Sequence, residues 1–277
     1  MIWPAEDLWQ DMVPFCPGLT VEILPQIDST NTELMRRARA GQLDPVLLVA
    51  ETQTAGRGRL GRPWLGQAGH TLMFSLGLLL QPNDWSGLSL AVGLSIAQSL
   101  DPHHQSGIAL KWPNDLWVSR PNAPTPWHKL AGILIETAVP SPAPTLAPRS
   151  HAFHTSLGPA RYCVVGVGLN MVAPEASGLS TPPVGLSELD PQQDAPSALR
   201  RIAPALLRMM LDFETSGFAP WRQAFHARDA LHDQAVRLSS GEQGWARGVD
   251  EQGAMLVEIN GQLQAVISSE ISVRPVL

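Results

Sequence analysis

The most informative segment of the sequence is Val46-Leu47-Leu48-Val49-Ala50-Glu51-Thr52-Gln53-Thr54-Ala55-Gly56-Arg57-Gly58-Arg59-Leu60-Gly61-Arg62-Pro63-Trp64, an apolar run that leads into alternating glycine and arginine. A second apolar run, Thr71–Leu80, follows it. Short apolar runs bounded by glycine or proline predict buried strands. The sequence therefore predicts strands at Val46–Glu51 and Thr71–Leu80, joined by a Gly/Arg loop, here defined as residues 51–64.

The composition of this loop indicates an anion pocket. Glycine allows tight turns and brings backbone N–H groups close to a ligand, and arginine offers a fixed positive fork to carboxylate or phosphate. A Gly-Lys-Ser/Thr ending is absent, which excludes a P-loop, and no helix pattern follows, which excludes the dinucleotide fingerprint. A solvated basic turn is the alternative. Three arginines within Arg57–Arg62 favour the pocket.

Outward from the loop, the pattern predicts a mixed α/β order. Thr30 and Glu33 have capping-box spacing and predict a helix start. Leu88, Val92, Ile96 and Leu100 recur every four residues and predict a helix with one apolar face. We further expect strands at Ile108–Trp112, Leu116–Val118, Leu130–Thr137 and Tyr162–Asn170, and helices at roughly Ser197–Glu214 and Phe218–Arg228.

Proline-rich stretches predict loops, because proline removes a backbone donor. They lie at Ser119–His128, Val139–Ala160 and Ala173–Pro196. After about Asp233 the sequence changes to short segments in which polar and apolar residues alternate. Asn260-Gly261 is a strong hairpin signal. We expect residues 1–231 to form one domain and residues 232–277 a small β-barrel with strands at Ala235–Leu238, Gly244–Val249, Ala254–Ile259 and Leu263–Ile267.

Composition narrows the function classes. The net charge is −6, whereas duplex-binding proteins collect positive charge, so we expect no DNA binding. No apolar run reaches the roughly 18 residues of a membrane span, and the N-terminus lacks a signal-peptide pattern. Cys16 and Cys163, the only cysteines, are expected to be buried apolar residues, which suits a reducing cytoplasm. The scattered histidines lack the further ligands of a zinc site.

Four motifs occur in order along the chain. After the Gly/Arg loop come Lys111-Trp112-Pro113-Asn114-Asp115, then Lys129-Leu130-Ala131-Gly132-Ile133-Leu134-Ile135-Glu136, then Gly166-Val167-Gly168-Leu169-Asn170. In these motifs the chain resembles the biotin protein ligase family, from about Asp28 to the C-terminus. The resemblance implies an α+β fold, with a mixed sheet flanked by helices as in class II synthetases and a C-terminal SH3-like barrel in which Arg247-Gly248-Val249-Asp250 is the most recognisable piece.

The resemblance also implies roles for individual residues. The residues implied to bind biotin are Ser29, Thr30, Asn31, Gln53, Gly56, Arg57, Gly58, Arg59, Lys129 and Gly132. Those implied to bind ATP are Arg57, Arg59, Arg62, Trp64, Lys111, Asn114 and Asn170, with Gly168 lining the same site. The implied catalytic residues are Lys129, Arg59 and Asp115, and Asp115 is also the candidate ligand of Mg²⁺.

Plainer interpretations stay open for several of these residues. Ser29, Thr30 and Asn31 suit a helix cap, and Lys111-Trp112-Pro113-Asn114 suits a strand that ends in a turn. Lys129 could be an ordinary exposed lysine. Trp64 and Trp112 suit the core as well as a stacking platform.

The expected reaction joins biotin, activated by ATP as biotinyl-adenylate, to a lysine of a biotin carboxyl carrier protein. Positioning and positive charge must bring two anions together, and Arg57, Arg59 and Lys129 are the expected suppliers. Lipoate or octanoate ligation is the enzyme alternative, and a biotin-responsive DNA-binding repressor is the alternative of another class. Homodimer formation is left open.

Overall fold

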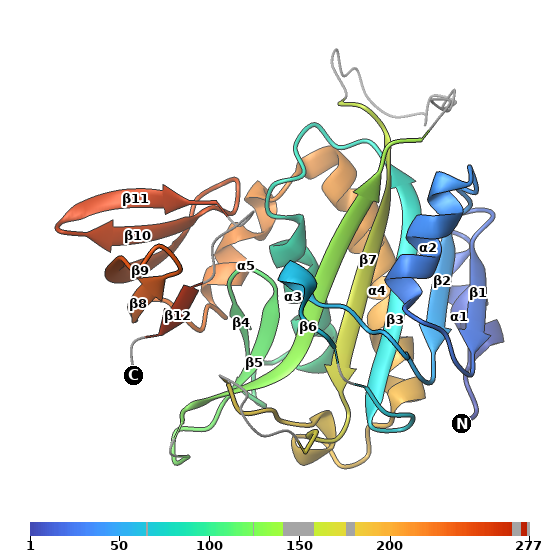
Figure 1. Cartoon of the computed structure of the whole chain (residues 1–277), viewed down its shortest axis with the longest axis horizontal. Coiled ribbons are helices and arrows are strands. Elements are labelled where there is room, and N and C mark those ends of the chain that lie inside the picture. The colour runs from blue at the N-terminus through green and yellow to red at the C-terminus, as the bar shows by residue number, and fades with distance from the viewer. Residues whose placement is uncertain (65, 124, 141–157, 176–180, 268–272, 276–277) are drawn as a thin grey trace.

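A seven-stranded sheet in the order β1-β2-β3-β7-β6-β5-β4 runs through the molecule (Figure 1). The computed structural model describes residues 1–64, 66–123, 125–140, 158–175, 181–267 and 273–275. β1 pairs with β2 in parallel, and the other neighbours are antiparallel. The strands are β1 Thr20–Leu24, β2 Val46–Ala50, β3 Thr71–Leu80, β4 Ile108–Lys111, β5 Asp115–Ser119, β6 Trp127–Ala138 and β7 Arg161–Asn170.

The apolar run of β2 is continuous because both faces of the sheet are covered. Leu47 and Val49 belong to the larger core cluster, whereas Val46 and Leu48 belong to a smaller cluster that contains Leu34. Successive side chains of a strand point to opposite faces. A strand buried on both faces therefore lacks the alternation of polar and apolar residues in its sequence.

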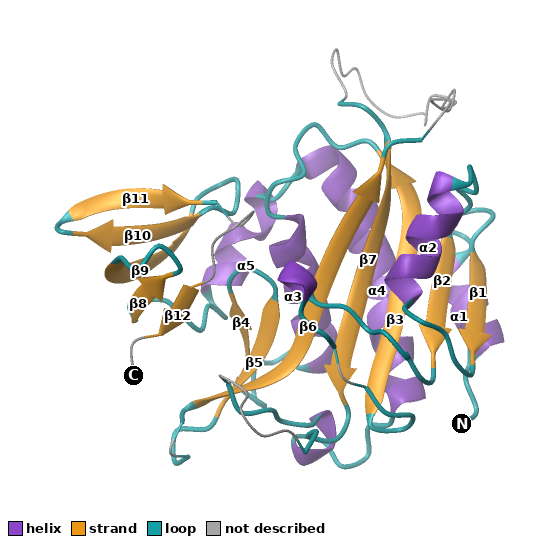
Figure 2. Cartoon of the chain, in the orientation of Figure 1, coloured by secondary structure: helices purple, strands orange, loops and turns teal. Residues whose placement is uncertain are grey.

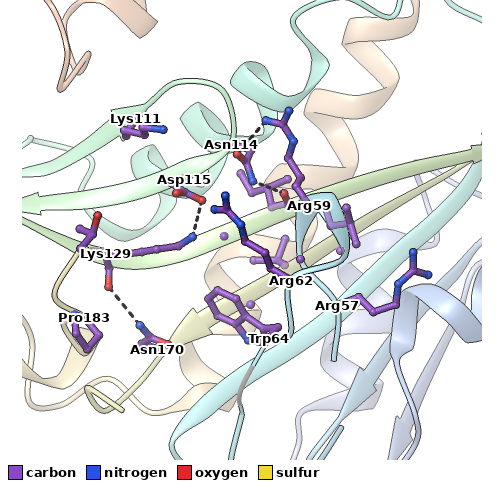
Figure 3. Close-up of a pocket in the computed structure, with 18 of the residues that line it drawn as sticks. Arg57, Arg59, Arg62, Trp64, Lys111, Asn114, Asp115, Lys129, Asn170 and Pro183 are labelled. Carbon is purple, nitrogen blue, oxygen red and sulfur yellow. Dashed lines mark hydrogen bonds and ion pairs between the residues drawn. The ribbon is translucent and has the colours of Figure 1, made fainter. Parts of the chain in front are cut away.

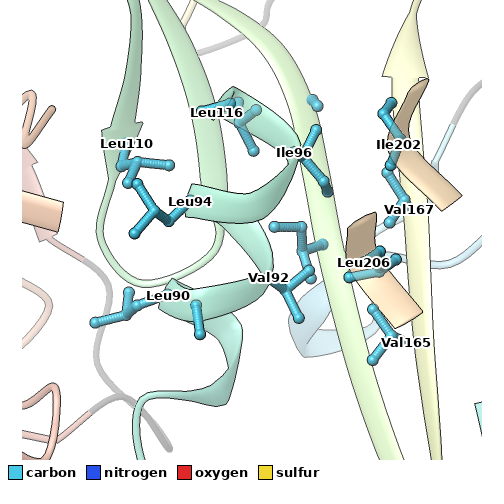
Figure 4. Packing of buried hydrophobic residues seen from close by; sticks show 14 of the residues in the cluster. Leu90, Val92, Leu94, Ile96, Leu110, Leu116, Val165, Val167, Ile202 and Leu206 are labelled. Carbon is cyan, nitrogen blue, oxygen red and sulfur yellow. The ribbon is translucent and has the colours of Figure 1, made fainter. Parts of the chain in front are cut away.

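Five helices are described (Figure 2): α1 Ala5–Met12, α2 Thr30–Arg39, α3 Leu88–Leu100, α4 Ala195–Ser216 and α5 Arg222–His226, with 3₁₀ turns at Arg59–Gly61, Leu186–Glu188 and Ala219–Trp221. α2 packs on β2, β3, β6 and β7, and α3 packs on α4 and β4–β6. Figure 4 shows Leu94 of α3 beside Leu110 and Leu116, and Ile202 of α4 beside Val167 of β7. The sheet therefore lies between helical layers.

Two details of the predicted helices are wrong. α3 has buried residues on nearly all sides rather than on one face, because α4 and three strands surround it. The cap of α2 is Ser29, whose side chain accepts from the Thr32 backbone N–H, and not Thr30. Thr30 instead turns inward and binds Gln53.

The C-terminal strands form a second, five-stranded antiparallel sheet in the order β11-β10-β9-β8-β12. Its strands are β8 Ala235–Leu238, β9 Gln243–Val249, β10 Met255–Ile259, β11 Gln262–Val266 and β12 Val273–Pro275. The predicted hairpin is confirmed, because Asn260 and Gly261 both have positive φ, at 51° and 77°, between β10 and β11. The indole N–H of Trp112 donates to the Gly253 carbonyl at 3.1 Å. This hydrogen bond joins the turn before β10 to the Lys111–Asp115 motif.

The N-terminal elements and the proline-rich loops differ in part from the expectations. α1 and β1 were not predicted. The first proline-rich loop ends earlier than expected, since Trp127 and His128 already belong to β6, and residue 124 lies outside the described residues. Most of the second loop, residues 141–157, also lies outside them, as do residues 176–180 of the third.

Cys16 and Cys163 are buried as predicted, and burial raises the pKa of the Cys163 thiol to about 12. No described helix has the length and apolarity needed to cross a membrane.

A buried arginine supports the junction between α3, β4 and α5. The guanidinium of Arg228, 6% exposed, donates to the Ile108 carbonyl at 3.1 Å and pairs with the Asp101 carboxylate at 3.7 Å. Replacing it (Arg228→Leu) leaves a buried carboxylate without its counter-charge, and we expect a loss of about 3–5 kcal/mol in the free energy of unfolding. Denaturant titration measures this loss. Arg200→Leu, which removes the exposed pair with Asp7, is the control and should leave the midpoint almost unchanged.

Candidate functional site

A cavity of about 810 Å³ opens between the Gly/Arg loop, the start of α2 and strands β5–β7 (Figure 3). Its wall includes nearly all the residues that the sequence pointed to: Ser29, Thr30, Asn31, Gln53, Arg57, Gly58, Arg59, Arg62, Trp64, Lys111, Asn114, Asp115, Lys129, Gly132, Gly168 and Asn170. Segments far apart in sequence therefore meet at one site, which is large enough for a drug-sized ligand.

Gly56 is the exception among the predicted biotin-binding residues, since it is not part of the wall. Its carbonyl accepts from the Trp64 N–H, and a Cβ at this position would lie 2.5 Å from the Trp64 carbonyl oxygen. Gly56 therefore closes the base of the loop. The need for glycine here comes from backbone packing.

The wall is strongly positive although the chain is acidic. Its described residues include five cations, Arg57, Arg59, Arg62, Lys111 and Lys129, and one carboxylate, Asp115. The sequence holds only two lysines, and both are in this wall. A concave site lined by charge of one sign concentrates oppositely charged ligands. The cavity is therefore built for anions.

Lys129 is the centre of what we call the Lys129 end of the cavity. Its ammonium lies 2.8 Å from the Asp115 carboxylate and 5.6 Å from the centre of the Trp64 ring. Its backbone is also held: the N–H donates to the Pro182 carbonyl, and the carbonyl accepts from the Asn170 side chain at 3.2 Å. Lys129 is therefore fixed at both ends and is not an ordinary surface lysine.

Arg59 reaches the same end from the Gly/Arg loop. It donates to the Asn114 side-chain oxygen at 3.2 Å, and the Asn114 amide donates in turn to the Ile133 carbonyl at 2.9 Å. Burial lowers the pKa of Arg59 from its ordinary value, and the nearby Asp115 charge partly offsets this shift. An arginine remains charged under such conditions. The loop is thus latched to β5 and β6 through a cation.

Glycines on two strands make room for Trp64. A Cβ at Gly168 would lie 2.3 Å from the Trp64 ring, and one at Gly132 would lie 3.1 Å from it. Trp64 lines the cavity, whereas Trp112 is fully buried in the core. The two tryptophans that the sequence could not separate therefore differ in role, and only Trp64 can stack on a ligand.

The opposite end, which we call the α2 end, is a polar network around the first turn of α2. The backbone N–H of Thr30 donates to the Gln53 side-chain oxygen at 2.7 Å. The buried Ser75 hydroxyl lies 2.7 Å from the Thr30 hydroxyl and 2.6 Å from the Asn31 side-chain oxygen. The Asn31 amide nitrogen lies 3.1 Å from Glu136. Buried polar groups satisfied in this way hold one arrangement.

Arg57 belongs to this second end, which corrects the expectation that it acts beside Lys129. Figure 3 shows its side chain directed away from Lys129 and Asp115. Its guanidinium lies 3.5 Å from the Glu136 carboxylate and 3.5 Å from the Thr32 hydroxyl. The attraction of that carboxylate, on β6, accounts for the direction.

Several residues of the site lie outside the functional motifs of the sequence or have no role predicted from them. Ser75 lies inside a strand that reads as plain core, and Glu136 ends a motif without an obvious partner. Pro182 and Pro183 lie beside Lys129 through a parallel bridge. Trp117 and Trp127 line the cavity with ring centres 6.0 Å apart. A short hydroxyl residue within an apolar strand was the one available signal, and it was weak.

Gly166 offers a sharp test of the α2 end. A Cβ at this position would lie 2.1 Å from the Asn31 side-chain oxygen. We expect Gly166→Ala to displace Asn31 and to weaken binding of biotin, the acid that the sequence motifs imply, at least tenfold, while binding of ATP, the implied nucleotide, changes little. Titration calorimetry with each ligand measures both. Gly41→Ala is not a suitable control because its φ is +84°; Ala40→Ser, exposed at the end of α2, should bind both ligands normally.

The sequence model of the Biotin/lipoate A/B protein ligase family matches residues 23–143. The biotin–[acetyl-CoA-carboxylase] ligase of Mycobacterium tuberculosis is 33% identical over 270 residues, which are 91% of this chain and 88% of that protein. The bifunctional ligase/repressor BirA of Escherichia coli is 32% identical over 265 residues, 93% of this chain and 75% of the relative. The chain belongs to the biotin protein ligase family.

The fold agrees with this membership. The structure of biotin protein ligase from Aquifex aeolicus in complex with biotin and ATP matches with a TM-score of 0.70 and 25% identity, over 94% of this chain and all of that one. The stretch matched by the family model contains the Gly/Arg loop, Asn114-Asp115 and Lys129. Three of the four motifs that line the cavity therefore lie within the stretch that the family model matches.

Proposed function

We propose that the protein uses ATP to join biotin to a lysine of a biotin carboxyl carrier protein through biotinyl-adenylate. The observation that carries this proposal is the polarity of the cavity. One end presents hydrogen-bond acceptors in a buried network, and the other presents Lys129 and Arg59. Biotin has a matching polarity, with urea N–H donors in its ring and a carboxylate at the end of its chain.

The number of hydroxyl protons at the α2 end explains why this end accepts hydrogen bonds from a ligand. The Asn31 oxygen can only accept, so the 2.6 Å contact takes the single hydroxyl proton of Ser75. Thr30 then gives its own proton to Ser75 at 2.7 Å or to the Gln53 oxygen at 3.1 Å. In both cases the Thr30 oxygen is left as an acceptor toward a ligand. A urea N–H satisfies it, whereas the dithiolane ring of lipoate offers no N–H, which favours biotin over the lipoate alternative.

The first step then follows from the geometry of the Lys129 end. A carboxylate oxygen of biotin attacks the α-phosphorus of ATP, an O–P bond forms, and the bond to the departing pyrophosphate breaks. Lys129 and Arg59 reduce the repulsion between the two anions and stabilise charge on the α-phosphate. Trp64 offers its ring face to the adenine. Asn114 and Asn170 hold Arg59 and the Lys129 backbone in place.

In the second step the carrier lysine amine attacks the carbonyl of the mixed anhydride, and AMP leaves. Asp115 is the carboxylate of the wall, and we assign it the role of orienting that amine and accepting its proton. Arg59 keeps the loop over the intermediate and limits entry of water. Each of these residue roles is part of the proposal.

Mg²⁺ is proposed as the partner of ATP, where it would neutralise the polyphosphate. The donor set fits a cation bound mostly by substrate, because Mg²⁺ in nucleotide sites is held by one or two carboxylates together with phosphates. Asp115 is the carboxylate that the described wall supplies. The described residues contain no group of three or more His, Cys, Asp or Glu side chains that could hold a metal ion, which agrees with a cation bound mostly by substrate.

We also propose that residues 1–231 form the adenylating domain and residues 232–277 a C-terminal domain. The strands of the second sheet support this division, since all of them lie within residues 235–275. A cytoplasmic location and the absence of DNA binding are part of the same proposal. Specific, biotin-dependent retardation of a promoter fragment would contradict the latter.

The function is tested by mixing the purified protein with ATP, magnesium, a biotin carrier domain and either biotin or lipoate. We expect mass spectrometry to show the carrier heavier by one biotinyl group and unchanged with lipoate. A carrier with its target lysine changed to arginine is the control. Transfer of lipoate but not of biotin would establish the alternative.

A further inference from the structure

We propose that Glu136 is a positioning residue for the ring of the acid substrate, acting through Asn31 and Ser75. This inference rests on the proposed function and deepens it. Glu136 is in β6 and is not part of the cavity wall. Its side chain is 21% exposed and contacts Asn31 and Arg57, so we expect it to act on a ligand through these neighbours.

The first link runs from Glu136 to Asn31. The Asn31 amide nitrogen donates to a Glu136 carboxylate oxygen at 3.1 Å and to the Leu134 carbonyl at 3.2 Å. Two acceptors on this side fix the orientation of the amide, because its oxygen must then point the other way. Hydrogen bonds to an ionised acceptor are roughly twice as strong as neutral ones. Glu136 is thus the anchor that keeps the Asn31 oxygen toward Ser75.

The second link runs from Asn31 to the substrate. With its oxygen toward Ser75, Asn31 takes the Ser75 proton at 2.6 Å, and the Ser75 oxygen lies 2.7 Å from the Thr30 hydroxyl. Two links have a fixed direction of donation, Ser75 to Asn31 and Asn31 to Glu136, and the Thr30 hydroxyl donates to Ser75 or to Gln53. A ligand N–H at Thr30 continues this series, and hydrogen bonds in series strengthen one another.

Glu136 also has a second partner, which connects the network to the loop. Arg57 lies 3.5 Å from the other carboxylate oxygen. This pair is partly exposed, with Arg57 at 49%, so the ion pair by itself contributes little to stability. Its consequence is geometric, because it brings a residue of the Gly/Arg loop beside the carboxylate that orients the ring site.

The test compares Glu136→Ala with Glu258→Ala, each of which removes a carboxylate that is paired with an arginine. Glu258 is in β10, outside the cavity wall. We expect Glu136→Ala to raise KM for biotin about tenfold, with kcat and KM for ATP changed less than threefold, and Glu258→Ala to match the wild type. Glu136→Gln, which keeps an acceptor for Asn31, should recover most of the loss.

A double-mutant cycle separates the relay from a general structural effect. Once Ser75→Ala has broken the chain, adding Glu136→Ala should raise KM for biotin by less than twofold, because residues of one hydrogen-bond network are not additive. Multiplied effects, or equal loss of kcat and of ATP binding, would overturn the inference. A wild-type protein that forms no biotinyl-adenylate would instead refute the proposed function, so the two failures are distinguishable. Thermal unfolding of each variant shows whether it is folded.

Discussion

Lys129→Ala should slow adenylate formation by about 10²–10³-fold, the usual loss when one preorganised donor is removed from a site of developing charge. Its side chain, 31% exposed, faces the cavity from β6, and Asp115 and the Trp64 ring hold its ammonium there. The fold should tolerate the change, since the ammonium is not buried in the core. Pyrophosphate release under single-turnover conditions measures the rate.

Lys111, the other lysine of the chain, supplies the comparison. It lies 5.8 Å from the centre of the Trp117 ring, and Figure 3 shows it on the far side of Asp115 from Arg59. Lys111→Ala should act mainly on KM for ATP. Lys129→Arg should not restore the rate, because a planar fork does not replace a compact point charge. A Lys129→Ala protein that keeps a tenth of the wild-type rate would remove Lys129 from the mechanism.

Arg59→Ala should have a different signature, in which the two half-reactions become uncoupled. Arg59 is the cation that latches the Gly/Arg loop to Asn114. Its loss removes charge from the proposed α-phosphate site, and we expect adenylate formation to fall about 10²-fold. Its loss also releases the loop, so water and free amines should reach the intermediate that does form.

The ratio of AMP released to biotin transferred measures this uncoupling. For the wild type, with carrier in excess, we expect a ratio close to one, and for Arg59→Ala a ratio several times higher. Arg59→Lys, which keeps a donor for Asn114, should lie between them. A slower but fully coupled Arg59→Ala protein would show that Arg59 contributes charge and does not hold the loop.

Most of the site was predictable because its residues come in short, dense motifs. Arg59, Asn114 and Lys129 each stand in a segment of unusual composition. The packing role of Gly56 was not predictable: the motif indicates that glycine is favoured there, but not that backbone packing against Trp64 is a cause.

The α2 end was only half predictable, because its network joins distant positions. Glu136 contacts Asn31 across 105 positions, and Ser75 contacts Asn31 across 44. No local sequence pattern predicts contacts between residues so far apart in the chain. The orientation of the Arg57 side chain likewise depends on Glu136, so the alternation of glycine and arginine along the loop could not predict it.

The first elements were missed for a simpler physical reason. α1 buries only Leu8 and Met12, so its apolar stripe is short. β1 is an edge strand with half-buried residues and a charged Glu22, so it lacks the continuous run that identified β2. Their places in the fold are set by contacts with β2 and α4, which the sequence does not display.

We propose that one cavity holds the ring of biotin at Thr30 and the α-phosphate of the nucleotide between Arg59 and Lys129. A crystal structure of the protein with a non-hydrolysable analogue of biotinyl-adenylate measures this directly. We predict a urea N–H within hydrogen-bonding distance of the Thr30 hydroxyl oxygen, and the phosphate mimic in contact with both cations. An analogue bound in the reverse direction, or outside this cavity, would contradict the account.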